Sequence, residues 1–256
     1  MEENTKVSCF LPVYNEAEVI NKNVIETYNY ISKLFKNYEV FVIDDASTDG
    51  SMDKLIPLLS EYQNLYLIHY TEGPSKRENL ACSFNNALGN IIVFIDSDLE
   101  ARLDTLDLLI SEIKNGADIA IGSRYIKESF YTRKLWRLLI SKVYNIAIRY
   151  IFNTNIRDHQ CGFKAFKLEI VLNLIEDMGY DRTYKRGWFW DAELLIRALR
   201  KKLKIIEIPV NWYDRKSRSF SIRENLSILP FIFKLKKEKQ TGEKYKPSFN
   251  IYEAKL

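Results

Sequence analysis

The segment Ile91-Ile-Val-Phe-Ile-Asp-Ser-Asp98 is the most informative part of this chain. Its five apolar residues predict a buried strand, and two carboxylates follow at the exit of that strand. An Asp-x-Asp pair alone is a weak signal, because short acidic pairs are common in turns. After a buried strand, Asp96 and Asp98 make a hard, oxygen-rich site that suits Mg²⁺ or Mn²⁺ together with a phosphate. Glu100 would point the same way in an extended segment, and the alternative for it is a surface carboxylate.

Similar apolar runs alternate with helical patterns along the first 120 residues. The runs predict strands at Val7–Leu11, Glu39–Ile43, Leu65–Ile68, Ile91–Ile95 and Ala117–Ile121. The segments between them predict helices at Ala17–Phe35, Ser51–Tyr62, Ser75–Leu88 and Thr105–Asn115, with Gly89 and Gly116 at helix C-terminal caps. This alternation predicts an α/β fold, in which a mostly parallel sheet is covered by helices on both faces.

Polar clusters follow four of the predicted strands. They are Pro12-Val-Tyr-Asn-Glu16, Asp44-Asp45, Asp96-Ser-Asp98 and Gly122-Ser-Arg124. Ligands of open α/β sheets bind beyond the carboxyl ends of the strands. Four clusters at four strand exits therefore predict one ligand site at this edge of the sheet.

The second half of the sequence is less regular. It predicts helices at Lys134–Phe152, Leu168–Glu176 and Asp191–Lys201, and strands at Gly162–Phe166 and Ile205–Val210. Aromatic, aliphatic and cationic residues mix in the first of these helices, which favours a membrane-surface helix; an ordinary core helix or a dimer interface is the alternative. We divide the chain into a domain at 1–220 and a basic amphipathic extension at 221–256. Within the extension, Ser221–Lys239 is interrupted by Pro230, and Gln240–Leu256 is expected to be a mobile tail.

Composition limits the class of protein. The 256 residues are 46% hydrophobic, enough for one large α/β domain with an appendage. The three cysteines, Cys9, Cys82 and Cys161, form no disulfide framework or zinc pattern, which favours a reducing compartment. No apolar signal region is evident, and no apolar run reaches the roughly 18 residues of a membrane span.

The net charge of +4 is distributed unevenly. From Arg200 onward there are 15 Lys+Arg and 6 Asp+Glu, whereas the preceding residues carry 23 and 28. A basic segment after a mildly acidic body suggests a polyanionic partner such as phosphates, anionic lipid or nucleic acid. A solvated basic tail is the alternative.

Several residues at the strand exits suit a nucleotide-sugar. Asp44 and Asp45 can accept hydrogen bonds from a base or a ribose, although a plain turn explains them as well. A metal on Asp96 and Asp98 would neutralise charge on a leaving nucleoside diphosphate. The planar fork of Arg124 suits a phosphate, with a surface salt bridge as the alternative.

Taken together, these motifs resemble a known family. The segments Pro12–Glu16, Val42–Gly50, Phe94–Leu99 and Gly122–Tyr125 are similar to inverting family 2 glycosyltransferases with the GT-A fold. The later segments Asp158–Phe166, Trp190–Leu195 and Glu207–Trp212 resemble polyprenyl-phosphate sugar synthases, which include dolichyl-phosphate mannose and glucose synthases. The resemblance runs from about Val7 to about Phe220.

The resemblance implies a role for each matching residue. The nucleoside pocket would be lined by Pro12, Tyr14, Glu16 and Asp45, and the metal ligands would be Asp96, Asp98 and Glu100. The donor diphosphate or the acceptor phosphate would be faced by Arg124 and Arg137, and the sugar and acceptor would be bordered by Asp158, Gln160 and Asp191. A basic loop that closes over phosphates would contain Arg215, Ser217 and Arg218. Helix-cap or turn roles are the alternatives for Asp158 and Asp191.

The chain departs from the family pattern at three points. Gly73-Pro-Ser-Lys-Arg-Glu-Asn79 stands where the family often has a Gly-Lys-Gly-like segment, so that Lys76 or Arg77 would replace the lysine. The basic loop is one residue short. Many relatives carry transmembrane helices after the catalytic domain, and this sequence shows none, so we expect attachment through amphipathic helices or a partner membrane subunit.

The remaining side chains fit simpler roles. His69 and His159 have no ligand-spaced partner, so a metal role is not expected for either. The tryptophans at 188, 190 and 212 are expected to pack in the core rather than stack on sugar.

The leading hypothesis is metal-dependent, inverting transfer of a hexose from a nucleotide-sugar to a polyprenyl phosphate. Such an acceptor is already anionic, so a general base is not essential. A rival is a glycosyltransferase that acts on a saccharide or protein hydroxyl, with Asp191 as the base. A non-catalytic nucleotide- or nucleic-acid-binding module is a further alternative, but a nucleic-acid patch would not need Asp96 and Asp98, so no nucleic-acid partner is expected.

The donor and the location follow from the resemblance. Gln160-Cys-Gly-Phe-Lys164 is slightly closer to the relatives that use UDP-glucose than to those that use GDP-mannose, and both donors stay open. We expect a cytoplasmic protein, peripheral at the inner face of a membrane, with a partner subunit or homo-oligomer as a further possibility.

Overall fold

The computed structural model describes residues 6–214, 227–238 and 249–253. Within them, one eight-stranded sheet has the order β10-β3-β2-β1-β4-β7-β5-β8. Its strands are β1 (Val7–Val13), β2 (Tyr38–Asp45), β3 (Leu65–Tyr70), β4 (Ile91–Ile95), β5 (Ile119–Ser123), β7 (Phe163–Lys167), β8 (Ile205–Pro209) and β10 (Phe249–Glu253). A small parallel pair joins β6 (Phe130–Thr132) to β9 (Asn211–Tyr213).

The large sheet is mostly parallel, as the sequence predicts. Parallel pairing joins β3, β2, β1 and β4, and also β5 and β8. Strand β7 runs antiparallel between β4 and β5, and β10 runs antiparallel to β3 at the edge. The predicted strand at Gly162–Phe166 therefore lies inside the sheet, next to the strand that carries Asp96 and Asp98.

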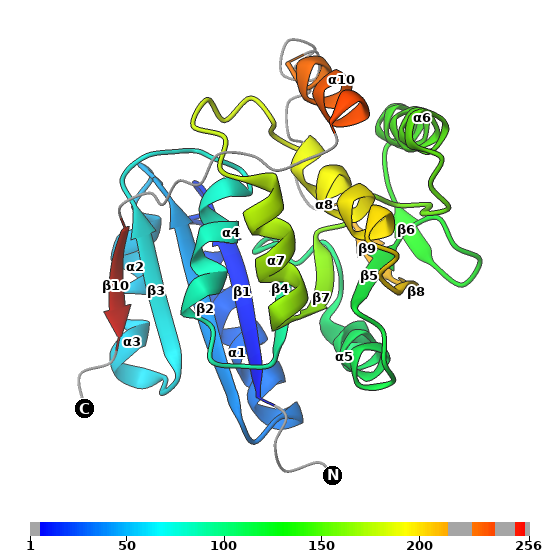
Figure 1. The fold of residues 1–256 in the computed structure, drawn as a ribbon. Coiled ribbons are helices and arrows are strands. Elements are labelled where there is room, and N and C mark those ends of the chain that lie inside the picture. Colours follow the sequence, from blue (N-terminus) through cyan, green and yellow to red (C-terminus); the bar gives the residue numbers. More distant parts are fainter. Residues whose placement is uncertain (1–5, 215–226, 239–248, 254–256) are drawn as a thin grey trace.

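Helices cover both faces of the sheet (Figure 1). The first face packs against α1 (Ile20–Leu34), the short helices α2 (Ser51–Leu55) and α3 (Leu58–Glu61), and α5 (Leu106–Lys114). The second face packs against α4 (Glu78–Ser83), α7 (Leu168–Met178) and α8 (Phe189–Arg200). Alternate residues of β1 enter the two cores, because successive side chains of a strand point to opposite faces: Cys9 and Leu11 join the first, and Phe10 joins the second.

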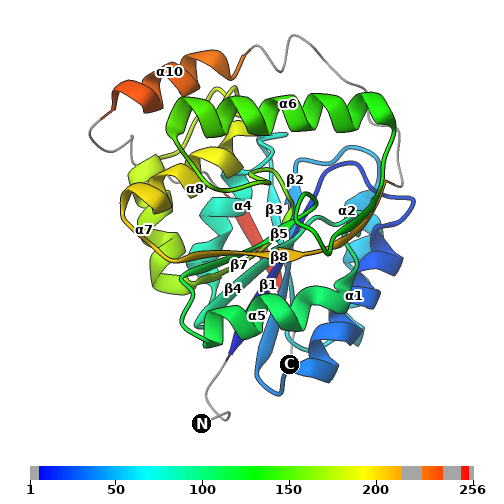
Figure 2. The same ribbon diagram turned by 90° about the vertical axis from the view of Figure 1, so that its right-hand side faces the viewer.

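Two helices lie beyond the end of the sheet to which the parallel strands point. They are α6 (Leu135–Phe152) and α10 (Leu229–Lys237), which Figure 2 shows at the same end of the molecule. Helix α10 packs on α8, where Ile232 and Leu235 meet Ala192 and Ile196. Pro230 lies in the first turn of α10, where its missing N–H costs no intrahelical hydrogen bond. The division at residue 220 stays a prediction.

Two predicted helices are shorter than expected. The segment 51–62 splits into α2 and α3 around Pro57, because proline cannot donate the hydrogen bond that a continuous helix needs at that point. The segment 75–88 contains α4 and a 3₁₀ turn at Phe84–Asn86. Its first residues are held by Asp45 instead of entering the helix, as described below.

The two glycines expected at helix caps behave differently. Gly116 follows α5 with φ +93°, a conformation that favours glycine, as predicted. Gly89 is not such a cap: a Cβ there would lie 2.5 Å from Ser8 Oγ, so glycine is needed for close packing against β1.

The prediction of a mobile tail at Gln240–Leu256 is wrong for residues 249–253. They form β10, which pairs with β3 from Phe249 opposite Tyr70 to Glu253 opposite Tyr66. The other tail residues, 240–248 and 254–256, lie outside the described residues, as do residues 221–226 and 239 of the preceding segment.

Candidate active site

The Asp-Ser-Asp turn lies at the carboxyl end of β4, as predicted. The backbone N–H of Asp96 donates to Gly162 O (2.9 Å), and the N–H of Leu99 donates to Asp96 O (3.1 Å). Leu99 has φ +49°, which closes the turn. From α1, Asn23 Nδ2 donates to Ser97 O (2.8 Å). Neighbouring elements thus fix both carboxylates at the strand exit.

Gly162 leaves room for the carboxylate of Asp96. A Cβ at this position would lie 1.8 Å from Asp96 Oδ2, so no other residue fits without moving that side chain. Sequence reasoning missed this role of the glycine, because residues 96 and 162 meet only through the antiparallel pairing of β4 with β7.

The donor set at the turn fits a metal shared with a substrate. The side chain of Asp96 is 23% exposed, whereas Asp98 and Glu100 are buried. Within the part of the chain that the structure describes, no three His, Cys, Asp or Glu side chains are grouped to hold a metal ion. Mg²⁺ is commonly held by one or two carboxylates together with substrate phosphates. Asp96 and Asp98 suit that mode, and the metal roles of Asp96, Asp98 and Glu100 all stay predictions.

Asp45 organises the segment that follows β3. Its carboxylate accepts hydrogen bonds from Ser75 N and Oγ (both 2.8 Å), Lys76 N (2.9 Å) and Asn79 Nδ2 (2.7 Å). Burial raises the pKa of Asp45, and these four donors act against that rise. A structural role is therefore evident, and contact with a nucleoside stays a prediction. The neighbouring Asp44 bonds His69 Nδ1 through Oδ2 (2.7 Å).

The β1 exit loop docks on the loop after β2. Glu16 N donates to Ser51 Oγ (3.1 Å), and Ala17 N donates to Asp49 Oδ2 (2.9 Å). Glu16 is buried, whereas Tyr14 in the same loop is exposed. The loop that carries the predicted nucleoside-binding residues Tyr14 and Glu16 thus lies beside the loop that follows Asp45, and Pro12 lies at the end of β1 just before it.

An ion-pair cluster links the Asp-Ser-Asp turn to α8. Arg77 Nη1 lies 2.8 Å from Asp96 Oδ1, and Arg77 Nε lies 3.2 Å from Asp191 Oδ2. Lys164 Nζ lies 2.6 Å from Asp191 Oδ1 and also donates to Cys161 O. Asp191 is almost fully buried in the first turn of α8. Of the two cations proposed to replace the family lysine, Arg77 forms these ion pairs, and Lys76 lies over the Trp188 ring (5.3 Å).

Arg124 and Asp158 form a second buried pair. Arg124 donates to both carboxylate oxygens, from Nε at 2.6 Å and from Nη2 at 2.8 Å. Its guanidinium also lies 4.7 Å from the centre of the Trp212 ring. Burial alone would raise the pKa of Asp158, but the charge and hydrogen bonds of Arg124 lower it. Both residues are predicted site residues, but here they bind each other, so their contacts with substrate stay predictions.

A third cluster lies at the start of α6. Arg137 Nη1 donates to Asp214 Oδ2 (3.4 Å), and Arg133 Nε lies 3.4 Å from Asp214 Oδ1. Within the described residues, Arg133 Nε and Nη1 are buried without a hydrogen-bond partner. Two cations thus share one carboxylate. Sequence reasoning singled out Arg137 but not Arg133, which the unsatisfied N–H groups reveal. Arg215, Ser217 and Arg218 of the predicted basic loop lie outside the described residues.

Helix α6 presents a large apolar face to the outside. Its buried side includes Ser141 and Asn145, which bond Tyr125 Oη (2.7 Å) and His159 N (2.9 Å). Most of its large apolar side chains face outward: Leu135, Trp136, Leu139, Ile140, Val143, Ile146 and Tyr150 are exposed, whereas Ile148 is buried and Tyr144, Ile151 and Phe152 pack in the same cluster as Ile148. On α10, Leu229 and Phe233 are exposed as well. An ordinary core-packing helix would turn most of its large apolar side chains inward.

The remaining predicted residues lie near these clusters. Gln160 N is 3.3 Å from Asp158 Oδ1, which keeps Gln160 next to the Arg124 pair. His159 is buried between Asn145 and Thr154, and burial lowers its pKa to about 4, so it is neutral at pH 7. The core-packing prediction is confirmed for Trp190 and Trp212, whereas Trp188 is partly exposed.

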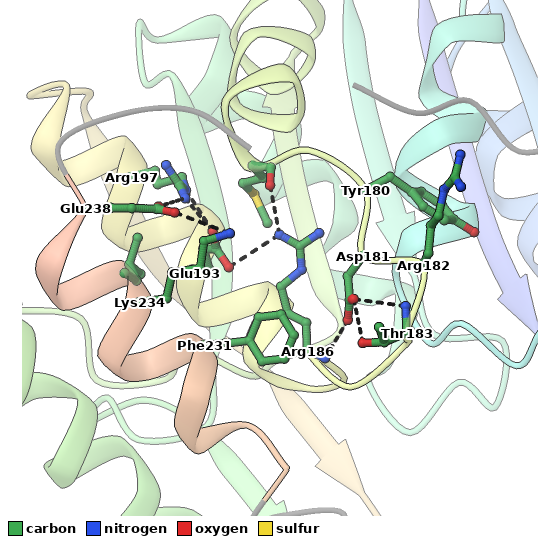
Figure 3. A pocket seen from close by; sticks show the side chains of 12 residues that line it. Tyr180, Asp181, Arg182, Thr183, Arg186, Glu193, Arg197, Phe231, Lys234 and Glu238 are labelled. Carbon is green, nitrogen blue, oxygen red and sulfur yellow. Dashed lines mark hydrogen bonds and ion pairs between the residues drawn. The ribbon is translucent and has the colours of Figure 1, made fainter. Parts of the chain in front are cut away.

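A pocket of about 260 Å³ lies away from this site, between α10, α8 and the loop before α8 (Figure 3). Its cations are already paired: Arg186 bonds Glu78 (2.7 Å), and Arg197 bonds Glu238 (2.7 Å). The lining contains none of the site residues predicted from the sequence. We assign the pocket a structural role, in which ion pairs join α10 to α8 and α4.

The comparisons with known proteins agree with this geometry. The sequence model of the family described as "Glycosyl transferase family 2" matches residues 8–174. The chain belongs to this family.

Curated relatives of this glycosyltransferase include enzymes named for lipid phosphates. It is 34% identical over 212 residues to the dolichol-phosphate mannosyltransferase of Pyrococcus furiosus, covering 80% of this chain and 55% of that one. It is 26% identical over 238 residues to the dolichyl-phosphate beta-glucosyltransferase of Saccharomyces cerevisiae, covering 83% and 68%. Glycosyltransferase AglD of Haloferax volcanii is 32% identical over 210 residues, which span 81% of this chain and 33% of AglD. The chain thus matches between a third and about two thirds of the length of these relatives.

Solved structures confirm the GT-A fold of this family 2 glycosyltransferase. Glucosyl-3-phosphoglycerate synthase from Mycobacterium tuberculosis, in complex with Mn²⁺, UDP and phosphoglyceric acid, superposes with a TM-score of 0.63 at 19% identity, covering 98% of this chain and 90% of that one. The same enzyme in complex with Mg²⁺ and UDP gives a TM-score of 0.61 at 20% identity, covering 91% and 78%. Within the described residues, no helix is long and apolar enough to cross a membrane.

Proposed function

We propose that this glycosyltransferase transfers a hexose, with inversion, from a nucleotide-sugar to the phosphate of a polyprenyl lipid at a membrane surface. The donor would be UDP-glucose or GDP-mannose, and the reaction would depend on Mg²⁺ or Mn²⁺. The names of the curated relatives support this acceptor class, and the shared fold with metal- and UDP-bound structures supports a nucleotide-sugar donor.

The outward apolar face of α6 is the observation that carries the proposal. A lipid chain or membrane interface would cover the outward face at Leu139, Val143 and Ile146, and each CH₂ group that it buries contributes about 0.8 kcal/mol. The same helix begins beside Arg133 and Arg137, two cations that share one carboxylate. An apolar face that starts beside two arginines suits an amphiphile with an anionic head.

The surroundings of Asp191 favour a phosphate acceptor over a hydroxyl acceptor. A hydroxyl would need a general base, and Asp191 is the candidate. Both of its oxygens are paired with cations, Oδ2 with Arg77 and Oδ1 with Lys164, so a proton on either oxygen would displace an ion pair. A lipid phosphate is already anionic, so no base is needed. Arg77 and Lys164 can then keep their ion pairs with Asp191 and fix its position.

The residues of the site have separate tasks in this proposal. When bound, the divalent cation stabilises the charge of the leaving nucleoside diphosphate, and Asp96 and Asp98 would hold it. Arg133 and Arg137 would orient the acceptor phosphate for in-line attack on the anomeric carbon. No proton has to be removed from that nucleophile.

The test is transfer of labelled sugar into an organic-extractable product. The protein is incubated with Mg²⁺ or Mn²⁺, a short polyprenyl phosphate and radiolabelled UDP-glucose or GDP-mannose in parallel. We expect label in the lipid phase with one donor, and a loss of at least about 100-fold in Asp98→Ala. Asp107→Ala removes an exposed carboxylate on α5 and is the matched control.

The outcome separates the proposed acceptor from its rival. No lipid label with either donor, alongside metal-dependent donor binding, would overturn the polyprenyl-phosphate acceptor and favour a saccharide or protein hydroxyl. In that case Asp191→Asn should abolish transfer to the hydroxyl acceptor, because the candidate base is then missing. No metal-dependent donor binding at all would revive a non-catalytic binding module.

A further inference from the structure

Arg77 occupies the space between two carboxylates of the site. Its guanidinium reaches Asp96 at 2.8 Å and Asp191 at 3.2 Å, and it is almost fully buried. Two aromatic rings flank it, Phe94 at 5.0 Å and Trp188 at 5.6 Å from the guanidinium carbon. The guanidinium is therefore held in place from several sides.

The backbone on either side of Arg77 is also fixed. Asp45 accepts a hydrogen bond from Lys76 N, and the next residue, Glu78, is paired with Arg186 through both of its oxygens. Arg77 N donates to Ser75 O (2.9 Å). With its backbone and its ring contacts fixed, Arg77 is not positioned to swing out of the site when a ligand enters.

We infer that Arg77 is an internal cation that makes metal binding at Asp96 conditional on the nucleotide diphosphate. This inference rests on the proposed metal-dependent function. It assigns Arg77 as a positioning residue that couples the two ligands, a role that neither the Asp-x-Asp motif nor the family match assigns.

The charge balance of the cluster gives the physical reason. Asp96 and Asp191 carry two negative charges, and Arg77 and Lys164 carry two positive charges. Arginine does not lose its proton in proteins, so a divalent cation that arrives alone at Asp96 meets a carboxylate already neutralised and a fixed positive charge nearby. In a buried site that repulsion is weakly screened.

A diphosphate reverses this balance. Its negative charges offset the divalent cation and attract Arg77, so that Asp96 can share its oxygens between the metal and the guanidinium. Metal and nucleotide should therefore strengthen each other's binding, and by thermodynamic linkage the factor is the same in both directions. Arg77 increases that factor because it weakens the binding of metal alone.

Electron paramagnetic resonance of Mn²⁺ measures this coupling without any acceptor or turnover. The free-ion signal is titrated with full-length protein, with and without UDP, for wild type, Arg77→Gln and Arg77→Met. Arg197→Gln is the matched control, because it removes another buried arginine that is paired with carboxylates, and its partners Glu193 and Glu238 are not among the groups that hold Arg77. Thermal unfolding checks that each variant is folded, and Arg77→Met keeps an apolar side chain between the two rings if Arg77→Gln does not fold.

We expect Arg77→Gln and Arg77→Met to bind Mn²⁺ alone roughly tenfold more tightly than wild type, which corresponds to ~1.4 kcal/mol. UDP should then enhance Mn²⁺ binding by a factor about tenfold smaller than in wild type. Arg197→Gln should leave both quantities unchanged.

Two results would overturn the inference. One is that, without UDP, the Arg77 variants bind Mn²⁺ as tightly as wild type or more weakly. Arg77 would then only hold the Asp96 carboxylate in place. The other is a wild-type protein in which UDP does not tighten Mn²⁺ binding. Failure of sugar transfer to lipid, with the coupling present and lost in the variants, would instead overturn the proposed acceptor and leave this inference standing.

Discussion

Arg124 and Asp158 are joined by two parallel hydrogen bonds inside the protein, although 34 residues separate them in the sequence. The pair links the exit of β5 to the loop before β7. Glu207 on β8 extends the link, because its carboxylate accepts hydrogen bonds from the backbone N–H groups of Arg157 and Asp158 (both 3.0 Å). Three segments at one edge of the sheet are thereby fixed relative to one another.

Breaking this pair from one side should destabilise the fold. Asp158→Asn leaves the buried charge of Arg124 without its counterion, and we expect a loss of about 3–5 kcal/mol in the free energy of unfolding. Urea denaturation measures it. The double variant Arg124→Met with Asp158→Leu removes both charges and should lose less than Asp158→Asn alone; a double variant that is less stable than the single one would contradict a charge-based explanation.

Stability should depend on pH through His159. Burial lowers its folded pKa to about 4 from an ordinary value near 6.5, so the unfolded chain binds an extra proton between these two pH values. The contribution of His159 to the free energy of unfolding is therefore complete above about pH 6.5. It is lost as the pH falls toward 4, and the total loss is about 3 kcal/mol. Urea midpoints from pH 7 to pH 4 should fall less steeply in His159→Gln than in wild type; equal slopes would contradict the prediction.

Gly162→Ala should impair the site without unfolding the protein. The added Cβ would lie 1.8 Å from Asp96 Oδ2 and must push that carboxylate aside. We expect Mn²⁺ binding in the presence of UDP to weaken by roughly tenfold or more, as judged from the free-ion signal. Gly116→Ala is the control, because its positive φ costs about 1 kcal/mol of stability but its Cβ would meet nothing within 4 Å. Equal Mn²⁺ binding by both variants would contradict the proposed role of Gly162.

The outward face of α6 should bind lipid vesicles. Leu139→Glu and Ile146→Glu place a charge on that face without touching the core, so they should leave thermal stability unchanged and weaken co-sedimentation with anionic vesicles by roughly tenfold or more. Leu88→Glu changes a residue that is even more exposed but lies before β4, and it should bind like wild type. Vesicle binding that is the same in all three variants would exclude α6 as the membrane-facing surface.

Arg133 should act on the acceptor and not on the donor. Replacing it by methionine removes one of two cations that share Asp214, and a charge-assisted hydrogen bond contributes about 1.5–3 kcal/mol. We expect KM for a polyprenyl phosphate to rise by roughly tenfold or more, with KM for the donor unchanged. Lys142→Met removes an exposed cation from the middle of α6 and serves as the control; an equal effect of both variants would indicate general attraction to the membrane.

The sequence predicts much of the sheet because its central strands are continuous apolar runs. Ile91–Ile95 is observed with the predicted boundaries, and the polar clusters lie at the strand exits because parallel strands end at one edge. Among the expectations that depended on local pattern alone, the helix boundary at Gly116 is confirmed, whereas the one at Gly89 is not.

Side-chain partners far apart in sequence were not predictable in this way. Arg77 and Asp191 are 114 residues apart and meet only because α4 and α8 pack on the same face of the sheet. The pairing of Arg124 with Asp158 likewise depends on β7 entering the sheet between β4 and β5. Periodicity assigns residues to faces, but it does not say which charged groups neutralise each other when those faces meet.

The pairing of β10 with β3 has a consequence for biosynthesis. In the chain order, about 180 residues separate the end of β3 from the strand that covers its edge. At typical translation rates of about 5–20 residues per second, β3 leaves the ribosome roughly ten to forty seconds before its partner has been made. Throughout that interval the nascent sheet presents a bare row of backbone donors and acceptors, which is the feature that other chains most readily pair with. We therefore expect the newly made protein to depend on chaperones during that interval more than its finished fold suggests.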